Sequence, residues 1–218
     1  MAVAQGVACL GQPDLLQPRF LCFPVHGDLN LGNILVNTDG FTVIDPRGTL
    51  DYWDPIYDLG KSLFSLTVFD DVMESGLEVT RRIRSGVPEF DVRLLEDRTV
   101  DVALAMEFLT MLEDLPFLSR RHRYDPFWRE RLLLVHAVHC LAEAACRISD
   151  DSPRAFGPHA GISARRLLAK GLHLIGIRLL NACVNQLECT RKVGPPDIRP
   201  IISWSDQHEP RSRTAEKA

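Results

Sequence analysis

The sequence predicts an α+β fold that is mainly α-helical, with one small β-hairpin near its start. Residues 34–36 and 41–44 are short runs of β-forming residues, and the stretch between them, Asn-Thr-Asp-Gly, is typical of a turn. From residue 54 onwards, apolar residues recur at helical spacing over long segments. We therefore expect a hairpin followed by a chain that is helical throughout.

The register of the hairpin decides which side chains share a face. If residues 38–40 form a three-residue loop, Asn33 lies opposite Asp45 on the same face of the hairpin. A two-residue turn at residues 39–40 would shift the register by one and place the two side chains on opposite faces. We favour the three-residue loop as a hypothesis, because it brings the polar side chains of Asn33 and Asp45 together on one face.

Residues suited to phosphoryl-transfer chemistry lie at the ends of the hairpin. The preceding loop, residues 26–33, reads HGDLNLGN, so Asp28 and Asn33 are five positions apart. This is the Asp-to-Asn spacing of the kinase catalytic loop, with Gly27 in place of its arginine. Asp45 follows a hydrophobic strand, as the magnesium-binding Asp does in that class of enzyme. Each residue alone is ordinary for a turn or a strand end, but together they indicate a phosphotransfer site.

At these positions the sequence resembles the aminoglycoside phosphotransferase and choline kinase-like family of small-molecule kinases. The C-terminal lobe of that family carries H-G-D-x-x-x-x-N followed by I-D, and the detailed resemblance covers residues 20–70. It implies a protein kinase-like C-terminal lobe with Asp28 as the catalytic base and His26 shaping the loop. It also implies that Asn33 and Asp45 bind Mg²⁺ together with ATP or another nucleoside triphosphate. The reaction implied is phosphate transfer to a hydroxyl group of a small molecule.

The first predicted helix begins at Asp54-Pro55, with Asp54 as its N-cap and proline at the first helical position. Residues 54–61 resemble the D-P-x-x-D-L-A helix of the same family. There the second Asp supports the catalytic loop from beneath, and the matching residue is Asp58. Alternatively, Asp58 only favours the helix dipole, and both interpretations stay open.

Three further helices are predicted at residues 98–118, 126–148 and 163–188. The second is apolar nearly all round, which predicts a central buried helix. It carries His136 and His139, which we interpret as polar helix residues rather than a zinc site, because no third ligand accompanies them.

We divide the chain into a lead-in segment, residues 1–19, a kinase-like lobe, residues 20–190, and a tail, residues 191–218, whose polar composition predicts disorder. The N-terminal lobe of a kinase supplies a glycine-rich loop and a lysine that reaches the phosphates. The residues before His26 include Arg19 but no lysine and no glycine-rich loop. We therefore expect an isolated C-terminal lobe, which would be a truncated product, half of a split enzyme or a domain without catalysis.

Two functional classes follow from these observations. The first is a small-molecule kinase acting as a partial enzyme; the second is an inactive kinase-like module that binds a ligand or partner. Because phosphate contacts normally supplement the magnesium ligands, the chain alone is expected to bind Mg²⁺-ATP weakly or not at all. The surface that a missing lobe would leave open predicts self-association or a partner chain that supplies this lobe.

Composition narrows the partners and the compartment. The formal net charge of −4 argues against nucleic-acid binding, and Arg81, Arg82 and Arg84 are predicted to form a solvated basic face. The six cysteines form no Cys-x-x-Cys motif, which predicts reduced thiols in a cytoplasmic protein. Residues 1–10 lack the features of a signal peptide, and no segment resembles the ~20 apolar residues of a membrane span.

The acceptor is not readable from the sequence beyond its hydroxyl group. Asp51, Asp54 and Asp58 favour a cationic acceptor such as an aminoglycoside or choline. Arg47, beside the predicted metal site, favours an anionic one such as a sugar acid or a phosphorylated compound. These signals conflict, and both alternatives stay open.

Overall fold

The computed structural model describes residues 16–47, 52–95, 99–114, 118, 125–149 and 162–193. Most of the predicted lead-in and nearly all of the predicted tail lie outside these residues. The elements in chain order are η1 (Leu31–Asn33), β1 (Ile34–Asn37), β2 (Gly40–Val43), α3 (Ile56–Phe64), the π-helical turn η2 (Ser65–Phe69), α4 (Asp70–Ser75), β3 (Leu77–Arg84), β4 (Val87–Leu94), α5 (Thr99–Asp114), α7 (Trp128–Ser149) and α8 (Ile162–Val193). The prediction of a mixed, mostly helical fold is confirmed.

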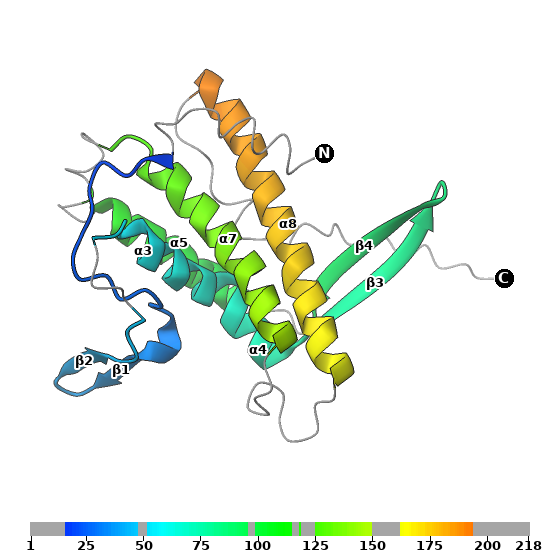
Figure 1. The fold of residues 1–218 in the computed structure, drawn as a ribbon, viewed down its shortest axis with the longest axis horizontal. Helices are drawn as coiled ribbons and strands as arrows, with labels where there is room; N and C mark the ends of the chain where they lie inside the picture. Colours follow the sequence, from blue (N-terminus) through cyan, green and yellow to red (C-terminus); the bar gives the residue numbers. More distant parts are fainter. Residues whose placement is uncertain are drawn as a thin grey trace.

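The helices α7 and α8 run antiparallel and pack side by side along most of their length (Figure 1). Gly176 of α8 permits their close approach, because a Cβ atom there would lie 2.6 Å from Leu141 Cδ2 of α7. The core between them also takes side chains from α3, η2 and the β3–β4 hairpin. Its buried members are Phe64, Val68, Val72, Leu77, Val92, Leu133, Ala137, Cys140, Ala144, Leu168, Leu172, Ile175, Leu179 and Cys183. The predicted position of α7 as a central buried helix is confirmed.

A second apolar cluster lies on the other side of α3. It joins α3 to α5 and to the first turns of α7, and its buried members are Ile56, Leu63, Ala105, Leu109, Leu112, Leu118, Trp128 and Leu132. Since Phe64 belongs to the first cluster and Leu63 to the second, α3 is wedged between them. It also approaches α7 closely at Gly60, where a Cβ atom would lie 2.6 Å from Val135 Cγ1. Packing on both sides therefore fixes the position of α3 in the fold.

The β1–β2 hairpin exists as predicted, but its predicted register is wrong. Asn37 pairs with Gly40, so the loop is the two-residue turn Thr38-Asp39 and the strands are shifted relative to both registers considered. Asn37 Oδ1 accepts a hydrogen bond from the backbone N–H of Asp39 at 2.9 Å, which closes the turn early. Asn33 therefore lies opposite Ile44 and not opposite Asp45. The backbone N–H of Ile44 donates to the Asn33 carbonyl at 2.9 Å.

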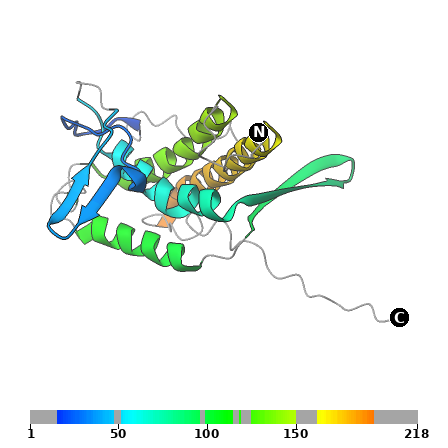
Figure 2. The ribbon, with the colours of Figure 1, turned by 90° about the horizontal axis from the view of Figure 1, so that it is seen from below.

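The β3–β4 hairpin corrects the prediction that everything after residue 54 is helical. It closes through the turn Ser85-Gly86, whose φ angles of 52° and 79° match the left-handed pair of a tight hairpin turn. Its base packs on α8, while the rest projects away from the helices, opposite the β1–β2 hairpin (Figures 1 and 2). The three arginines at residues 81, 82 and 84 are exposed on β3, as predicted, but Arg81 lies on the opposite face of the strand from Arg82 and Arg84, so they do not form one basic face.

Helix α8 is the longest element, and it bears on the prediction that no segment spans a membrane. By length and composition alone, Arg165–Gln186 could cross a bilayer, although half of the tested window is buried inside the fold. A helix at the centre of a globular core has the same composition, because it is apolar on most of its sides. The expected absence of a membrane-spanning segment remains a prediction.

Candidate active site

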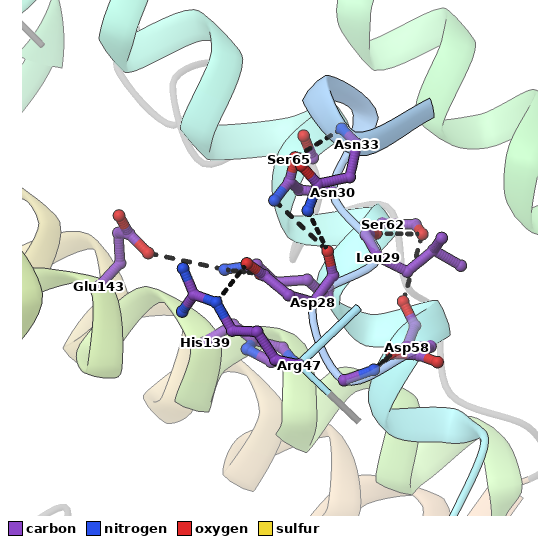
Figure 3. A network of polar contacts seen from close by, with 12 residues as sticks. Asp28, Leu29, Asn30, Asn33, Arg47, Asp58, Ser62, Ser65, His139 and Glu143 are labelled. Atoms are coloured by element: carbon purple, nitrogen blue, oxygen red, sulfur yellow. Dashed lines mark hydrogen bonds and ion pairs between the residues drawn. The ribbon is translucent and has the colours of Figure 1, made fainter. Parts of the chain in front are cut away.

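The loop before η1 is held from beneath by Asp58, in the first turn of α3. The backbone N–H groups of His26 and Gly27 donate to the two carboxylate oxygens of Asp58 at 2.7 and 2.8 Å (Figure 3). Gly27 has a φ of 81°, a conformation that favours glycine and accounts for its place in the loop. The Asp58 carboxylate also lies where the helix dipole favours negative charge. Asp58 therefore contacts the loop as the first interpretation expects, and the helix dipole is not its only role.

Two serines on the same face of α3 and η2 extend this support. Ser62 Oγ donates to the carbonyl of Leu29 at 2.7 Å (Figure 3). The N–H of Leu31 donates to Ser65 Oγ at 3.2 Å. Sequence reasoning missed both serines. The signal was their helical spacing from Asp58, which places all three on one side of the helix.

His26 joins the loop to the end of the β1–β2 hairpin. Its Nε2 lies 2.9 Å from the carbonyl of Ile44, and its Nδ1 lies 3.3 Å from the backbone N–H of Asp28. Nδ1 accepts a hydrogen bond, so we assign the proton to Nε2, which donates to Ile44. The His26 carbonyl also accepts from the N–H of Arg47 at 2.9 Å. The imidazole therefore shapes the loop, and among the described residues it makes no hydrogen bond to the Asp28 carboxylate.

Asp28 lies on this loop with its side chain buried and flanked by two cations. Lys61 Nζ is 3.2 Å from Oδ1, and Arg47 Nε is 3.1 Å from Oδ2. Burial by itself raises the pKa of Asp28, but Lys61, and after it Arg47, outweigh this and hold the pKa below its usual value. Asp28 is therefore a carboxylate at neutral pH, the protonation state that a general base requires.

A chain of charges continues from Asp28 to α7. Lys61 Nζ also lies 3.6 Å from Glu143 Oε2, and Glu143 is paired with Arg147 one turn further along α7. The sequence analysis did not identify Lys61, Glu143 or Arg147 as site residues. Lys61 stands three positions after Asp58, a spacing that places it near the loop, but nothing in the sequence links Glu143 to this region.

Asn33 and Asp45 are the predicted metal ligands. Asn33 Nδ2 donates to the carbonyl of Asp28 at 2.9 Å, which leaves the amide oxygen of Asn33 for another partner. Asp45 adopts a φ of 55° just beyond β2, and no hydrogen bond or ion pair within the described residues ends on its carboxylate. An amide oxygen and a carboxylate fit the oxygen preference of Mg²⁺.

The predicted face-to-face pairing of Asn33 and Asp45 is wrong, as the register shows. In the part of the chain that the structure describes, no three His, Cys, Asp or Glu side chains are grouped as a metal site. Mg²⁺ is usually held by one or two carboxylates together with substrate phosphates, so the ion needs few protein ligands.

A pocket of about 350 Å³ opens beside the Asp28 carboxylate. It lies between the loop, α3 with η2, and α7, and its lining residues are Asp28, Asn30, Arg47, Lys61, Phe69, Glu143, Cys146 and Arg147. Asn33 and Asp45 do not line it. The pocket therefore adjoins the predicted base and not the predicted metal ligands.

Part of the chain matches a known protein family. Residues 13–98 match the sequence model of the Phosphotransferase enzyme family, known as APH. The resemblance predicted from the loop and hairpin motif is thereby confirmed over these residues, which run from the end of the lead-in segment through the β3–β4 hairpin. No curated protein and no solved structure matches the chain. The match ends before α7, whose residues complete the pocket.

Proposed function

We propose that this protein transfers a phosphoryl group from ATP to a hydroxyl group of a small molecule, with Asp28 as the base. The observation that carries the proposal is the state of Asp28: a buried, ionised carboxylate at the edge of a pocket, on a loop that Asp58 fixes. The family match over residues 13–98 supports phosphotransfer in general.

In this mechanism the acceptor hydroxyl enters the pocket and donates a hydrogen bond to Asp28. Lys61 is mostly buried and keeps Oδ1 in place, whereas the side chain of Arg47 is 69% exposed and can leave Oδ2 when the hydroxyl arrives. Asp28 then orients the hydroxyl oxygen and takes its proton as the phosphoryl group is transferred. Phosphoryl transfer depends mainly on such positioning and on charge.

Asn33 and Asp45 are the residues that would hold Mg²⁺. When bound, the ion supplies positive charge that neutralises the phosphate oxygens. The hydrogen bond from Asn33 to the Asp28 carbonyl would fix the metal side of the site relative to the base.

The test is Asp28→Asn in the full chain, assayed for phosphate transfer from radiolabelled ATP at millimolar Mg²⁺-ATP to a panel of small hydroxyl compounds. Turnover should fall roughly 10²–10⁴-fold, because the amide cannot accept the proton. Asp39→Asn, which changes an exposed carboxylate in the β1–β2 turn, is the matched control and should keep wild-type turnover. Equal turnover in wild type and Asp28→Asn would remove Asp28 from the mechanism.

A second candidate is a binding module that has lost catalysis. One observation favours it: both carboxylate oxygens of Asp28 are engaged in ion pairs, an arrangement that holds charges in place without any reaction. The same assay separates the two functions. No transfer by the wild-type chain to any acceptor, with ligand binding at the pocket retained, would establish the binding module.

A further inference from the structure

The residues that favoured a cationic acceptor and the residue that favoured an anionic acceptor occupy different places in the structure. Asp54 is hydrogen-bonded at the start of α3 and paired with Arg131, and Asp58 holds the loop backbone. Neither lines the pocket, and Asp51 lies outside the described residues. Two of the three carboxylates that favoured a cationic acceptor are therefore engaged elsewhere, whereas Arg47 lines the pocket.

The pocket itself carries an excess of positive charge. Its lining has three cationic side chains against two carboxylates. Lys61 lies between both carboxylates, Asp28 and Glu143, and Arg147 is paired with Glu143. Arg47 is different, because in the described part of the chain its side chain makes one ion pair, from Nε to Asp28. The other end of its guanidinium group is free to bind a ligand.

This geometry suits the recognition of a planar anion. When the arriving hydroxyl displaces Arg47 from Oδ2 of Asp28, the guanidinium group can offer two of its nitrogens as a fork to a carboxylate or a phosphate. An anion held there would lie beside the oxygen that accepts the hydroxyl proton. Since Asn33 and Asp45 do not line the pocket, the anion belongs to the acceptor side of the site rather than to the nucleotide side.

We infer that the pocket takes a small acceptor that carries an anionic group, a carboxylate or a phosphate, in addition to its hydroxyl group. Arg47, which lies beside Asp28 (Figure 3), is the residue that selects this acceptor by binding the anion. That the bound anion belongs to a phosphate acceptor depends on the proposed phosphotransfer, whereas the anion site itself does not.

The test is calorimetric titration of the full chain without nucleotide, at low ionic strength. The probes are glycerol 3-phosphate and glycerate as the two anion sources, glycerol as the neutral probe, and choline as the cationic probe. At least one anionic probe should bind at least about tenfold more tightly than glycerol and choline, because charge-assisted hydrogen bonds contribute this much. The stronger of the two anionic probes identifies which group the site prefers.

Three variants locate the site. Arg47→Ala should weaken anion binding at least about tenfold, and Arg47→Lys should restore part of it, since the charge returns without the fork. Asp28→Asn should strengthen anion binding, because it removes a neighbouring negative charge and releases Arg47. Arg93→Ala is the matched control: Arg93 is 65% exposed and paired with Glu78 on the β3–β4 hairpin, and its loss should leave binding unchanged.

Four results would overturn the inference. The first two are that neither anionic probe binds more tightly than glycerol, or that choline binds more tightly than both anionic probes. The other two are that Arg47→Ala and Arg93→Ala weaken anion binding equally, or that Mg²⁺-ATP displaces the anionic probe. The last result would assign the anion site to the nucleotide. Failure of the proposed function is a separate outcome. Anion binding that depends on Arg47, with no phosphate transfer, would keep this site and reject the phosphotransfer. Transfer to choline or glycerol that depends on Asp28, without anion selection, would keep the phosphotransfer and reject this site.

Discussion

At the scale of single residues, a small number of side chains hold the Asp28 loop in place. Asp58 accepts two backbone hydrogen bonds from consecutive residues, one on each oxygen, which fixes both the position and the orientation of the loop. Hydrogen bonds to a charged acceptor are stronger than those between neutral groups. The neighbouring bond from Ser62 to the Leu29 carbonyl is neutral and acts on the next turn of the same loop.

The role of Asp58 is open to a direct test with Asp58→Asn. The substitution keeps the shape of the side chain, but its amide nitrogen would face a backbone N–H, so one hydrogen bond is replaced by two opposed donors. We expect a loss of about 1–3 kcal/mol in local stability. Amide hydrogen exchange measured by NMR should speed up at His26 and Gly27, and Asp39→Asn should leave both unchanged. Unaltered exchange at these two amides would contradict the supporting role.

Residue types and their spacing anticipated part of this site but not all of it. Asp28, Asn33 and Asp58 could be singled out because each stands at a characteristic distance from another residue along the chain. Glu143 and Arg147 could not, because they reach the pocket only through the packing of α7 on α3. Charges brought together by tertiary packing leave no local pattern in the sequence.

At the scale of elements, the two hairpins show what local pattern does and does not determine. The strands of the β1–β2 hairpin were predicted within a residue of their ends, because β-formers flank an obvious turn. Their register depended on one side-chain hydrogen bond, from Asp39 N–H to Asn37, which strand propensity does not specify. The β3–β4 hairpin was missed because arginines occupy positions on both of its faces, although Ser85-Gly86 is a typical turn pair.

Three glycines set the distances between packed elements, and one of them joins the β3–β4 hairpin to α8. A Cβ atom at Gly171 would lie 2.4 Å from Leu77 Cδ2 and 2.5 Å from Leu77 Cδ1, too close for both to keep their places. The other two, Gly60 and Gly176, meet α7 in the same way. Their spacing along the chain gives no hint of these contacts.

Gly171→Ala should therefore destabilise the protein despite the better helix propensity of alanine. Overpacking costs typically 1–3 kcal/mol, against a gain of about 1 kcal/mol for replacing glycine in a helix. In a Leu77→Ala background the clash is gone, and the same substitution should become neutral or stabilising. The free energies of unfolding of the four proteins in this cycle, from urea denaturation, measure the coupling. An equal effect of Gly171→Ala in both backgrounds would show that Leu77 does not limit this contact.

At the scale of the whole molecule, a polar seam runs between α7 and the layer formed by α3 and η2. The side chains of α7 that form it recur every three to five residues, so they lie on one face of a helix whose other faces are apolar. The contacts in chain order are Arg131 with Asp54 and Asp125, His136 with Thr67, His139 with the Tyr57 carbonyl, and Glu143 with Lys61. The seam begins in the buried core and ends in the pocket beside Asp28, so the packing of α7 and the charge of the site are linked.

Two histidines of this seam are buried in the neutral state. Burial, together with the neighbouring His139, lowers the pKa of His136 to about 3. Burial is also the main reason why the pKa of His139 falls to about 4; the Tyr57 carbonyl opposes this change. Thr67 Oγ donates to the Leu63 carbonyl and accepts from His136 Nε2, so His136 Nδ1 carries no proton and has no partner among the described residues.

These pKa values predict that the fold loses stability in mild acid. Below the ordinary histidine pKa of 6.5, the unfolded chain binds protons at both positions and the folded chain does not. The stability contributed by the neutral histidines is thus fully present above pH 6.5. It falls as the pH drops towards 4, by roughly a few kcal/mol in total. His136→Gln, which cannot titrate, should flatten this part of the curve, whereas His173→Gln, at an exposed position of α8, should not. Thermal unfolding followed by circular dichroism from pH 7.5 to 4 measures the slope, which is independent of any constant loss that the substitution causes. Parallel curves for wild type and His136→Gln would mean that folding does not lower the pKa of His136.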